Sequence, residues 1–268
     1  MSIQLKQPQE IISRGIAVVT GASAGLGRAL VVALSERGVR VAGFARSEAG
    51  LAETARLLEG GRFVAKVVDV GHDDAVRTAF AELRREVGDI TILVNNAAVY
   101  PRIDFLEETP TSFMRSVQIN LGGVVSCTTA ALETMAETGV GRIVNVSTFA
   151  DLAPIPCSSA YSVSKGAARI FSKALVADLA DRFPDIVIST WIPGALNTAM
   201  GIPAGIDPAA AARWGAELAL WHDRSLNGAT FAGDRETLEP RSLRRRIKEA
   251  VLLRKPPVPR RLGPDRAM

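Results

Sequence analysis

The architecture is set near the N-terminus by Ile16-Ala-Val-Val-Thr-Gly-Ala-Ser-Ala-Gly-Leu-Gly27. Its first five residues are an apolar run that ends at a turn signal, which predicts a buried parallel strand. Gly21, Gly25 and Gly27 follow, and residues 28–37 carry apolar side chains at helical spacing. A glycine-rich turn from strand to helix lets the backbone approach a pyrophosphate, which the helix N-terminus binds. The spacing differs from the G-x-G-x-x-G fingerprint, and a merely tight turn is the alternative.

The remaining chain alternates between predicted strands and helices, with short links. Apolar runs predict strands at 38–44, 63–68, 90–94, 142–146, 186–191 and 228–233, and helical spacing predicts helices at 73–87, at 111–137 and through Tyr161 to Leu179. This alternation predicts an α/β fold with a parallel sheet covered on both faces. Polar motifs stand at the ends of the strands, where open α/β sheets bind their ligands.

Composition is that of an ordinary globular chain. Of 268 residues, 47% are hydrophobic and 22% charged, which fits one large core. The two cysteines, Cys127 and Cys157, give no disulfide framework, and no His/Cys/Asp cluster has metal-ligand spacing. Residues 1–13 do not resemble a signal peptide, and no apolar run approaches the about 20 residues that span a bilayer. We therefore expect a cytoplasmic protein without a metal.

The positive charge is concentrated at the C-terminus. Residues 241–268 hold ten basic and two acidic side chains, a net charge of +8, while residues 1–240 carry −4. The body gives no reason to expect nucleic-acid binding. Leu243, Ile247 and Val251 form a narrow helical stripe that we expect to dock on a neighbouring subunit, with an anionic membrane surface or a solvated, partly disordered end as alternatives. We expect the residues after this stripe to be loose.

Tyr161 and Lys165 are the strongest candidates for chemistry. They are four residues apart in a predicted helix, so both lie on one face, one turn apart. A cation there favours the phenolate and lowers the tyrosine pKa from about 10, which suits a general acid or base near neutral pH. The same spacing also occurs by chance between two surface side chains.

Arg46 bears on the choice of cofactor. It stands at the end of the second predicted strand, and no acidic residue appears before Glu48. An acidic side chain there would hold a ribose 2′-hydroxyl, whereas an arginine accommodates a 2′-phosphate. Arg46 therefore favours NADP(H) over NAD(H); a solvated loop arginine is the alternative.

These motifs together resemble the short-chain dehydrogenase/reductase family, in its single-domain, 3-oxoacyl-reductase-like form. The resemblance covers residues 16 to about 232 and rests on Thr20-Gly21-xxx-Gly25-x-Gly27, Asp69-Val70, Asn95-Asn96-Ala97, Asn120, Tyr161-xxx-Lys165 and Pro193-Gly194-xxx-Thr198. It implies a Rossmann-like, doubly wound parallel sheet in three α/β/α layers. The single domain would span residues 15–240, between an N-terminal extension, 1–14, and the basic tail, 241–268.

The resemblance also implies roles for residues. Tyr161 would protonate a carbonyl or act as base in reverse, Lys165 would bind the nicotinamide ribose and lower the tyrosine pKa, and Asn120 would anchor a water linking Lys165 to solvent. Asp69 and Val70 would contact the adenine, Asn95 the adenosine ribose, and the 193–198 segment the nicotinamide. The complete implied cofactor set is Gly21, Ser23, Gly25, Leu26, Gly27, Arg46, Asp69, Val70, Asn95, Ala97, Tyr161, Lys165, Pro193, Gly194 and Thr198.

Three positions depart from the family pattern. Thr148 stands thirteen residues before Tyr161, where the family usually has Ser; its hydroxyl can still donate to a substrate, and we prefer it to Ser147, which faces the other way. Ala98 replaces a common Gly. Ala24 occupies a place where many NADPH-preferring relatives carry Arg or Lys, which leaves Arg46 alone for the 2′-phosphate and NAD(H) open.

The expected function is NAD(P)H-dependent reduction of a ketone, or oxidation of a secondary alcohol. Mostly apolar segments near the site suit a small to medium, largely apolar substrate, with Cys157 in the pocket wall and residues 200–207 as a mobile lid. Tyr100 and Arg102 either hold a polar group or face solvent. The resemblance implies a homodimer or homotetramer. The alternative is a cofactor-binding, catalytically weak scaffold or regulatory protein that acts through its basic tail.

Overall fold

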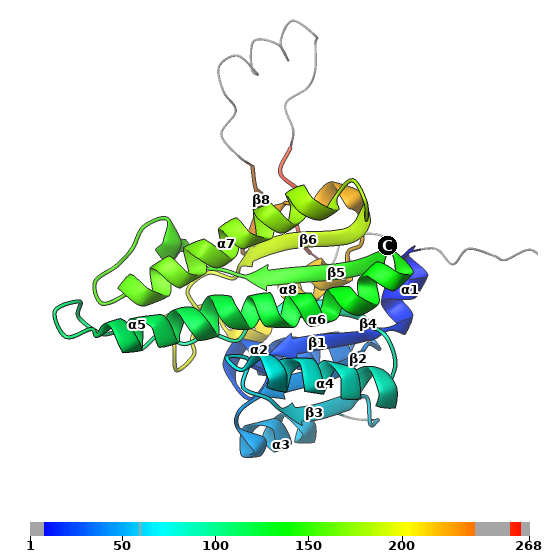
Figure 1. The fold of residues 1–268 in the computed structure, drawn as a ribbon, viewed down its shortest axis with the longest axis horizontal. Helices are drawn as coiled ribbons and strands as arrows, with labels where there is room; N and C mark the ends of the chain where they lie inside the picture. Colours follow the sequence, from blue (N-terminus) through cyan, green and yellow to red (C-terminus); the bar gives the residue numbers. More distant parts are fainter. Residues whose placement is uncertain (1–7, 59, 239–257, 264–268) are drawn as a thin grey trace, which may run out of the picture.

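A computed structural model describes residues 8–58, 60–238 and 258–263 (Figure 1). The described strands are β1 (Ile16–Thr20), β2 (Arg40–Ala45), β3 (Phe63–Val67), β4 (Ile90–Asn95), β5 (Val140–Val146), β6 (Asp185–Ile192), β7 (Thr230–Ala232) and β8 (Arg235–Thr237). The α-helices are α1 (Pro8–Arg14), α2 (Gly25–Ser35), α3 (Glu48–Arg56), α4 (Asp73–Glu86), α5 (Pro110–Val117), α6 (Gly123–Thr138), α7 (Ser159–Leu179) and α8 (Pro208–Leu220). A π-helical turn, Gln118–Gly122, joins α5 to α6.

The described strands form one sheet in the order β3-β2-β1-β4-β5-β6-β7-β8. Neighbours from β3 to β7 are parallel, and β8 returns antiparallel to β7. The chain first builds outward from β1 to β3 and then builds the other half from β4. The order therefore reverses between β1 and β4, which is where a doubly wound sheet opens a ligand crevice at its carboxyl edge. The Rossmann-like fold expected from the sequence is confirmed.

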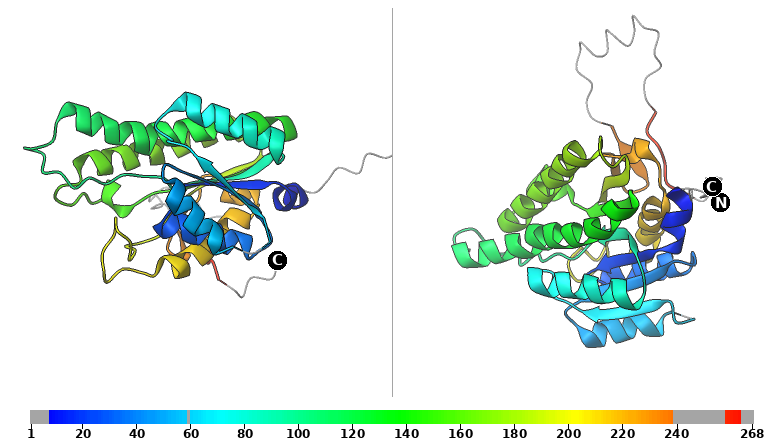
Figure 2. Two further views of the ribbon diagram at one scale, coloured as in Figure 1. Left: turned by 90° about the horizontal axis from the view of Figure 1, so that it is seen from below. Right: turned by 45° about the vertical axis from the view of Figure 1, so that its right-hand side comes forward.

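The sheet is covered on both faces, and each face has its own core. All five residues of β1 are buried, as in a parallel strand covered on both sides. Val19 packs into a core with α1, α2 and α8, whereas Val18 packs into a core with α4, α6 and α7. Figure 2 shows the two helical layers on opposite sides of the sheet. Three α/β/α layers result, with the carboxyl edge of the sheet left for the site.

A buried arginine ties the second half of the sheet to α8. Arg142 in β5 is fully buried, and it donates hydrogen bonds to the carbonyls of Leu218 and Trp221 near the end of α8. It also donates to the Val187 carbonyl and the Ser189 hydroxyl of β6. Because a buried cation needs its donors satisfied, these bonds fix α8 over β5 and β6.

The two chain ends pack differently from what the sequence suggested. Residues 8–14 of the expected N-terminal extension form α1, and Ile12 is fully buried in the core. At the other end, residues 258–263 are docked rather than loose. Arg261 forms an antiparallel bridge to Arg235 of β8, and Leu262 is buried in the core. The apolar stripe expected at residues 241–253 lies outside the described residues.

Arg260 explains why this last segment docks. Its guanidinium donates to both carboxylate oxygens of Glu236 at 2.6 and 2.7 Å, and it lies 5.5 Å from the centre of the Trp221 ring. The composition suggested a solvated end, but paired charge and aromatic contact outweigh the cost of ordering six residues. Within the described part of the chain, no helix has both the length and the apolarity needed to cross a bilayer.

Candidate active site

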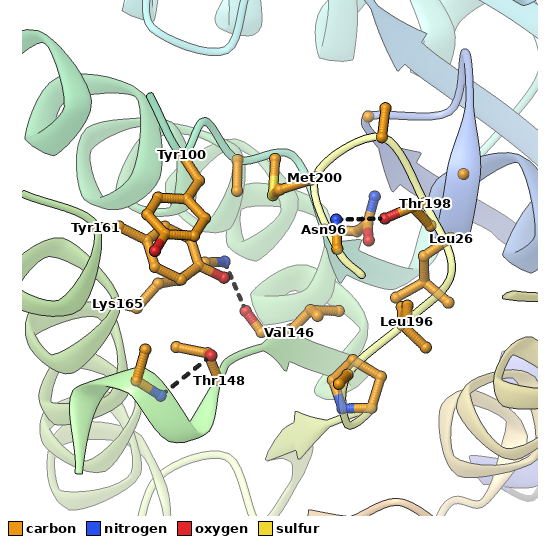
Figure 3. Close-up of a pocket in the computed structure, with 18 of the residues that line it drawn as sticks. Leu26, Asn96, Tyr100, Val146, Thr148, Tyr161, Lys165, Leu196, Thr198 and Met200 are labelled. Atoms are coloured by element: carbon orange, nitrogen blue, oxygen red, sulfur yellow. Dashed lines mark hydrogen bonds between the residues drawn. The ribbon is translucent and has the colours of Figure 1, made fainter. Parts of the chain in front are cut away.

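A cavity of about 700 Å³ opens at the carboxyl ends of β1, β4, β5 and β6. Its wall combines the glycine-rich turn, the segment after β4, the end of β5, the first turns of α7 and residues 193–202 (Figure 3). Of the predicted site residues, it brings together Gly21, Ser23, Gly25, Leu26, Gly27, Ala97, Thr148, Tyr161, Lys165, Pro193, Gly194 and Thr198. Residues from four separate sequence motifs, together with Thr148, therefore share one cavity.

The glycine-rich turn is shaped as a cradle. Gly21 and Gly25 have left-handed backbones, with φ of 71° and 51°. A Cβ on Gly27 would lie 2.0 Å from the Gly21 carbonyl oxygen, so only glycine fits there. The N-cap residue of α2, Ala24, makes no side-chain cap, which leaves the first backbone N–H groups of the helix to the cavity. This arrangement fits the pyrophosphate of a dinucleotide.

A smaller pocket of about 60 Å³ continues from the cavity and is lined by Arg46, Asp69 and Val70. Gly21 and Ala97 line both spaces, so the two are contiguous. Asp69 accepts a hydrogen bond from the Gly71 backbone at 3.0 Å, which fixes the turn after β3. The three residues expected near the adenosine end of a cofactor therefore lie together, with the exposed Arg46 at the edge.

Asn95 does not reach either pocket with its side chain, contrary to its predicted place beside the ribose. It is almost fully buried, and it donates to the Thr128 hydroxyl and to the Asn145 side chain at 3.1 and 2.8 Å. The next residue, Asn96, lines the cavity and donates to the Thr20 carbonyl at 2.8 Å. Alternate strand residues point to opposite sides, so the end of β4 turns Asn95 inward.

Lys165 and Tyr161 differ from expectation in how they interact. Lys165 is only 2% exposed, and its ammonium donates to the Val146 carbonyl at 2.8 Å. Burial lowers the pKa of Lys165 to about 8, partly opposed by the negative charge of Asp151. Burial also raises the pKa of Tyr161, while a hydrogen bond with Thr148 lowers it. Without a cofactor, desolvation therefore outweighs any lowering of the tyrosine pKa by the lysine.

Thr148 and Ser147 lie in different surroundings at the end of β5. Thr148 shares a hydrogen bond with Tyr161 and accepts another from the Ala150 backbone at 3.2 Å. Both residues touch the cavity wall, but the Ser147 hydroxyl is buried without a hydrogen-bond partner among the described residues. The contact with the phenol favours Thr148 over Ser147 as the substrate-facing hydroxyl.

Asn120 lies in the π-helical turn and is fully buried behind the cavity. Its amide accepts from the Val99 backbone N–H at 2.8 Å and donates to the Val99 carbonyl and the Ser164 hydroxyl at 2.9 and 3.0 Å. Both N–H groups of the amide are thus used by protein partners. The side chain thus links the loop after β4 to α7.

Tyr100 and Arg102 both line the cavity, although Arg102 is also exposed to solvent. The Tyr100 ring stacks on Tyr161, with ring centres 4.5 Å apart and planes at 19° (Figure 3). The Arg102 guanidinium lies 5.2 Å from the centre of the Tyr100 ring, and it donates to the Met200 and Gly201 carbonyls at 2.8 Å each. Its left-handed backbone, with φ of 56°, gave no recognisable pattern in the sequence.

Cys157 is not part of the cavity wall, contrary to the prediction. The wall includes its neighbours Ile155 and Pro156, but Cys157 is exposed. Its backbone is left-handed, with φ of 59°. In the described part of the chain, no three His, Cys, Asp or Glu side chains are grouped as metal ligands would be.

Known proteins with the same motifs share most of this chain. The family model for short chain dehydrogenases matches residues 15–207. Carbonyl reductase (NADPH) 2 of Sus scrofa is 35% identical over 193 residues, which cover 72% of this chain and 76% of the relative. A probable oxidoreductase of Mycobacterium tuberculosis, EphD, is 35% identical over 199 residues, covering 73% of this chain but 33% of the relative. The chain thus spans about a third of the length of that relative.

The fold comparison agrees with the sequence comparison. The crystal structure of a short-chain dehydrogenase from Streptomyces avermitilis superposes with a TM-score of 0.73 at 28% sequence identity. The match covers 82% of this chain and 88% of the other.

Proposed function

Because the chain belongs to the short-chain dehydrogenase/reductase family, we propose that it reduces a ketone, or oxidises a secondary alcohol, by hydride transfer with NADP(H). The observation that carries this proposal is the meeting of Tyr161, Lys165 and Thr148 in one cavity with the glycine-rich turn. A bound nicotinamide would supply or accept the hydride at the carbonyl carbon.

The protein would supply the proton and orient the carbonyl. In reduction, the Tyr161 phenol gives its proton to the carbonyl oxygen, and the Thr148 hydroxyl donates a hydrogen bond to the same oxygen. The charged Lys165 nearby favours the phenolate that remains. Tyr161 is a protonated phenol at neutral pH, as an ordinary tyrosine is, and burial raises its pKa further.

NADP(H) is the proposed cofactor, with NAD(H) as the alternative. Arg46 at the edge of the small pocket supports it, because a guanidinium forms charge-assisted hydrogen bonds with a 2′-phosphate. The name of the related carbonyl reductase also includes NADPH. Ala24 provides no second cation on the glycine-rich turn, so the preference would depend on Arg46.

A small to medium ketone with an apolar body is the proposed substrate. Ile155, Leu196, Met200 and Ile202 contribute apolar walls. Among the described lining residues there is no carboxylate, and the only cationic side chains are those of Lys165 and Arg102. Exposed apolar side chains on the 149–155 and 200–206 segments extend this surface around the opening.

The direct test is NADPH oxidation with a panel of ketones of graded size and polarity. We expect turnover with apolar ketones, and slower turnover with NADH. Equilibrium binding of NADPH, measured in parallel, separates a reductase from a cofactor-binding scaffold with little catalytic activity. Tight NADPH binding without turnover of any ketone would instead favour the scaffold function.

A homodimer or homotetramer remains part of the proposal. The exposed apolar residues Val163 and Ile170 on α7, and Met114 on the adjoining α5, support contact with a second copy. Light scattering on the full chain would test it. A monomer at micromolar concentration would argue against this assembly.

A further inference from the structure

A buried carboxylate lies beside the candidate catalytic residues and has no part in the proton transfer proposed above. Asp151 ends the 3₁₀ turn Phe149–Asp151, which follows Thr148 directly. Its side chain is 0% exposed, and its Oδ2 lies 2.5 Å from Nε of Arg169, which is 26% exposed. Neither carboxylate oxygen has a hydrogen-bond partner among the described residues, so the nearby Arg169 cation is what offsets the cost of burying this charge.

The ion pair continues the row of candidate catalytic residues along α7. Tyr161, Lys165 and Arg169 are spaced by four residues and lie on one face, so the pair forms one turn beyond Lys165. A Cβ on Gly166 would lie 3.5 Å from the Asp151 Cβ, which is ordinary contact distance. The turn that carries Thr148 therefore rests directly on the helix that carries Tyr161.

The charge of Asp151 acts on both members of the Tyr161–Lys165 pair. It raises the pKa of Lys165, against the effect of burial, and raises that of Tyr161, in the same direction as burial. The titratable or charged groups around Tyr161 are Tyr100 from the loop after β4, with Arg102 stacked on it, Asp151 from the segment after β5, and Lys165 on its own helix. The Thr148 hydroxyl adds a hydrogen bond to the phenol.

We propose that Asp151, paired with Arg169, is a positioning residue for the reaction. It anchors the turn that holds Thr148 onto α7, and it places a fixed negative charge beside the Tyr161–Lys165 pair. The inference rests on the proposed function for its catalytic meaning, but the charge effect is measurable on the protein without cofactor or substrate.

The chain offers a clean spectroscopic test because it contains only two tyrosines. In a Tyr100→Phe background, Tyr161 is the only phenol, and its ionisation can be followed through the ultraviolet absorbance of the phenolate. Adding Asp151→Asn should move the midpoint of this titration to lower pH, and Asp151→Glu should keep it near that of the background. Asp178→Asn, the same change at an exposed position of α7, is the matched control and should leave the midpoint unchanged.

A second variant separates charge from stability. Arg169→Gln alone leaves a buried carboxylate unpaired and should lower the melting temperature, whereas the Asp151→Asn/Arg169→Gln double variant removes both charges and should recover it. The double variant should still show the lowered midpoint of Tyr161. If Asp151→Asn alone does not fold, the Tyr161 titration can be measured in the double variant instead.

An unchanged midpoint in the Asp151→Asn or the double variant would overturn the proposal. So would equal shifts for Asp151→Asn and Asp151→Glu, or loss of fold in both neutral variants, which would reduce the pair to a structural role. Failure of the proposed function is read separately, as no turnover of any ketone by the wild-type chain. If turnover is present, the alkaline limb of the kcat/KM profile for reduction should move to lower pH in Asp151→Asn.

Discussion

Replacing Lys165 by methionine should stabilise the fold while removing the proposed activity. The ammonium of Lys165 is buried, and its hydrogen bond goes to the Val146 carbonyl. None of the described carboxylates lies within ion-pair distance of it. Methionine has a similar length and no charge, so it fills the same space without the cost of a buried cation.

The size of the effect follows from the lysine pKa. Burial lowers the pKa of Lys165 from 10.5 to about 8. Each unit corresponds to about 1.4 kcal/mol, so the buried charge costs roughly 3 kcal/mol of unfolding free energy at neutral pH. Methionine removes this cost but leaves the Val146 carbonyl without its donor, a loss of about 1–2 kcal/mol. The net gain of about 1–2 kcal/mol should raise the melting temperature by roughly 2–6 °C.

The pH dependence of this gain gives it a sharper test. The folded-state pKa of Lys165 is depressed, so the cost is complete below about pH 8 and disappears as the pH rises towards 10.5. Thermal melts across this range should show the advantage of Lys165→Met shrinking and then reversing, because only the lost hydrogen bond remains. Lys165→Arg keeps a buried charge and should not stabilise. A variant less stable than wild type at pH 7, or a difference that does not change with pH, would refute the reasoning.

Three further changes test other parts of the site and the fold. Thr148→Ala should lower kcat/KM for reduction by about 10²-fold or more, Thr148→Ser should retain activity, and Ser147→Ala should change little; the assignment is wrong if Ser147→Ala is the damaging change. Arg46→Ala should raise the KM for NADPH by about 10- to 100-fold with little effect on NADH, and a wild-type chain that prefers NADH would contradict the cofactor proposal. Arg260→Ala should lower the melting temperature by about 4–8 °C, because it leaves Glu236, whose side chain is only 9% exposed, without its partner; an unchanged value would show that the C-terminal segment does not contribute to stability.

Features that depend on local spacing could be predicted from the sequence. The glycines at 21, 25 and 27 occur where a strand meets a helix, and no larger side chain fits Gly27 there. Tyr161 and Lys165 share a helix face because they are four residues apart. The parallel sheet followed from the alternation of apolar runs and helical segments. In each case the sequence pattern that signals the feature lies within a few residues.

Features that depend on distant partners could not be predicted. Asn95 turns inward because Thr128 and Asn145, more than thirty residues away, complete its hydrogen bonds. Arg260 docks because Glu236 and Trp221 lie at the sheet edge, although its neighbours in sequence suggested a solvated tail. The pKa of Tyr161 is raised because the surroundings exclude water, which the spacing to Lys165 does not reveal.

Tyr161→Phe removes the one hydroxyl to which the proposed chemistry assigns the proton and alters little else. Initial rates of NADPH oxidation with the best ketone of the panel should fall by about 10²–10⁴-fold, because that is the usual contribution of a well-placed general acid. The affinity for NADPH, measured by its fluorescence on binding, should change little. Turnover near the wild-type rate in this variant would contradict the assignment of Tyr161 as the proton donor.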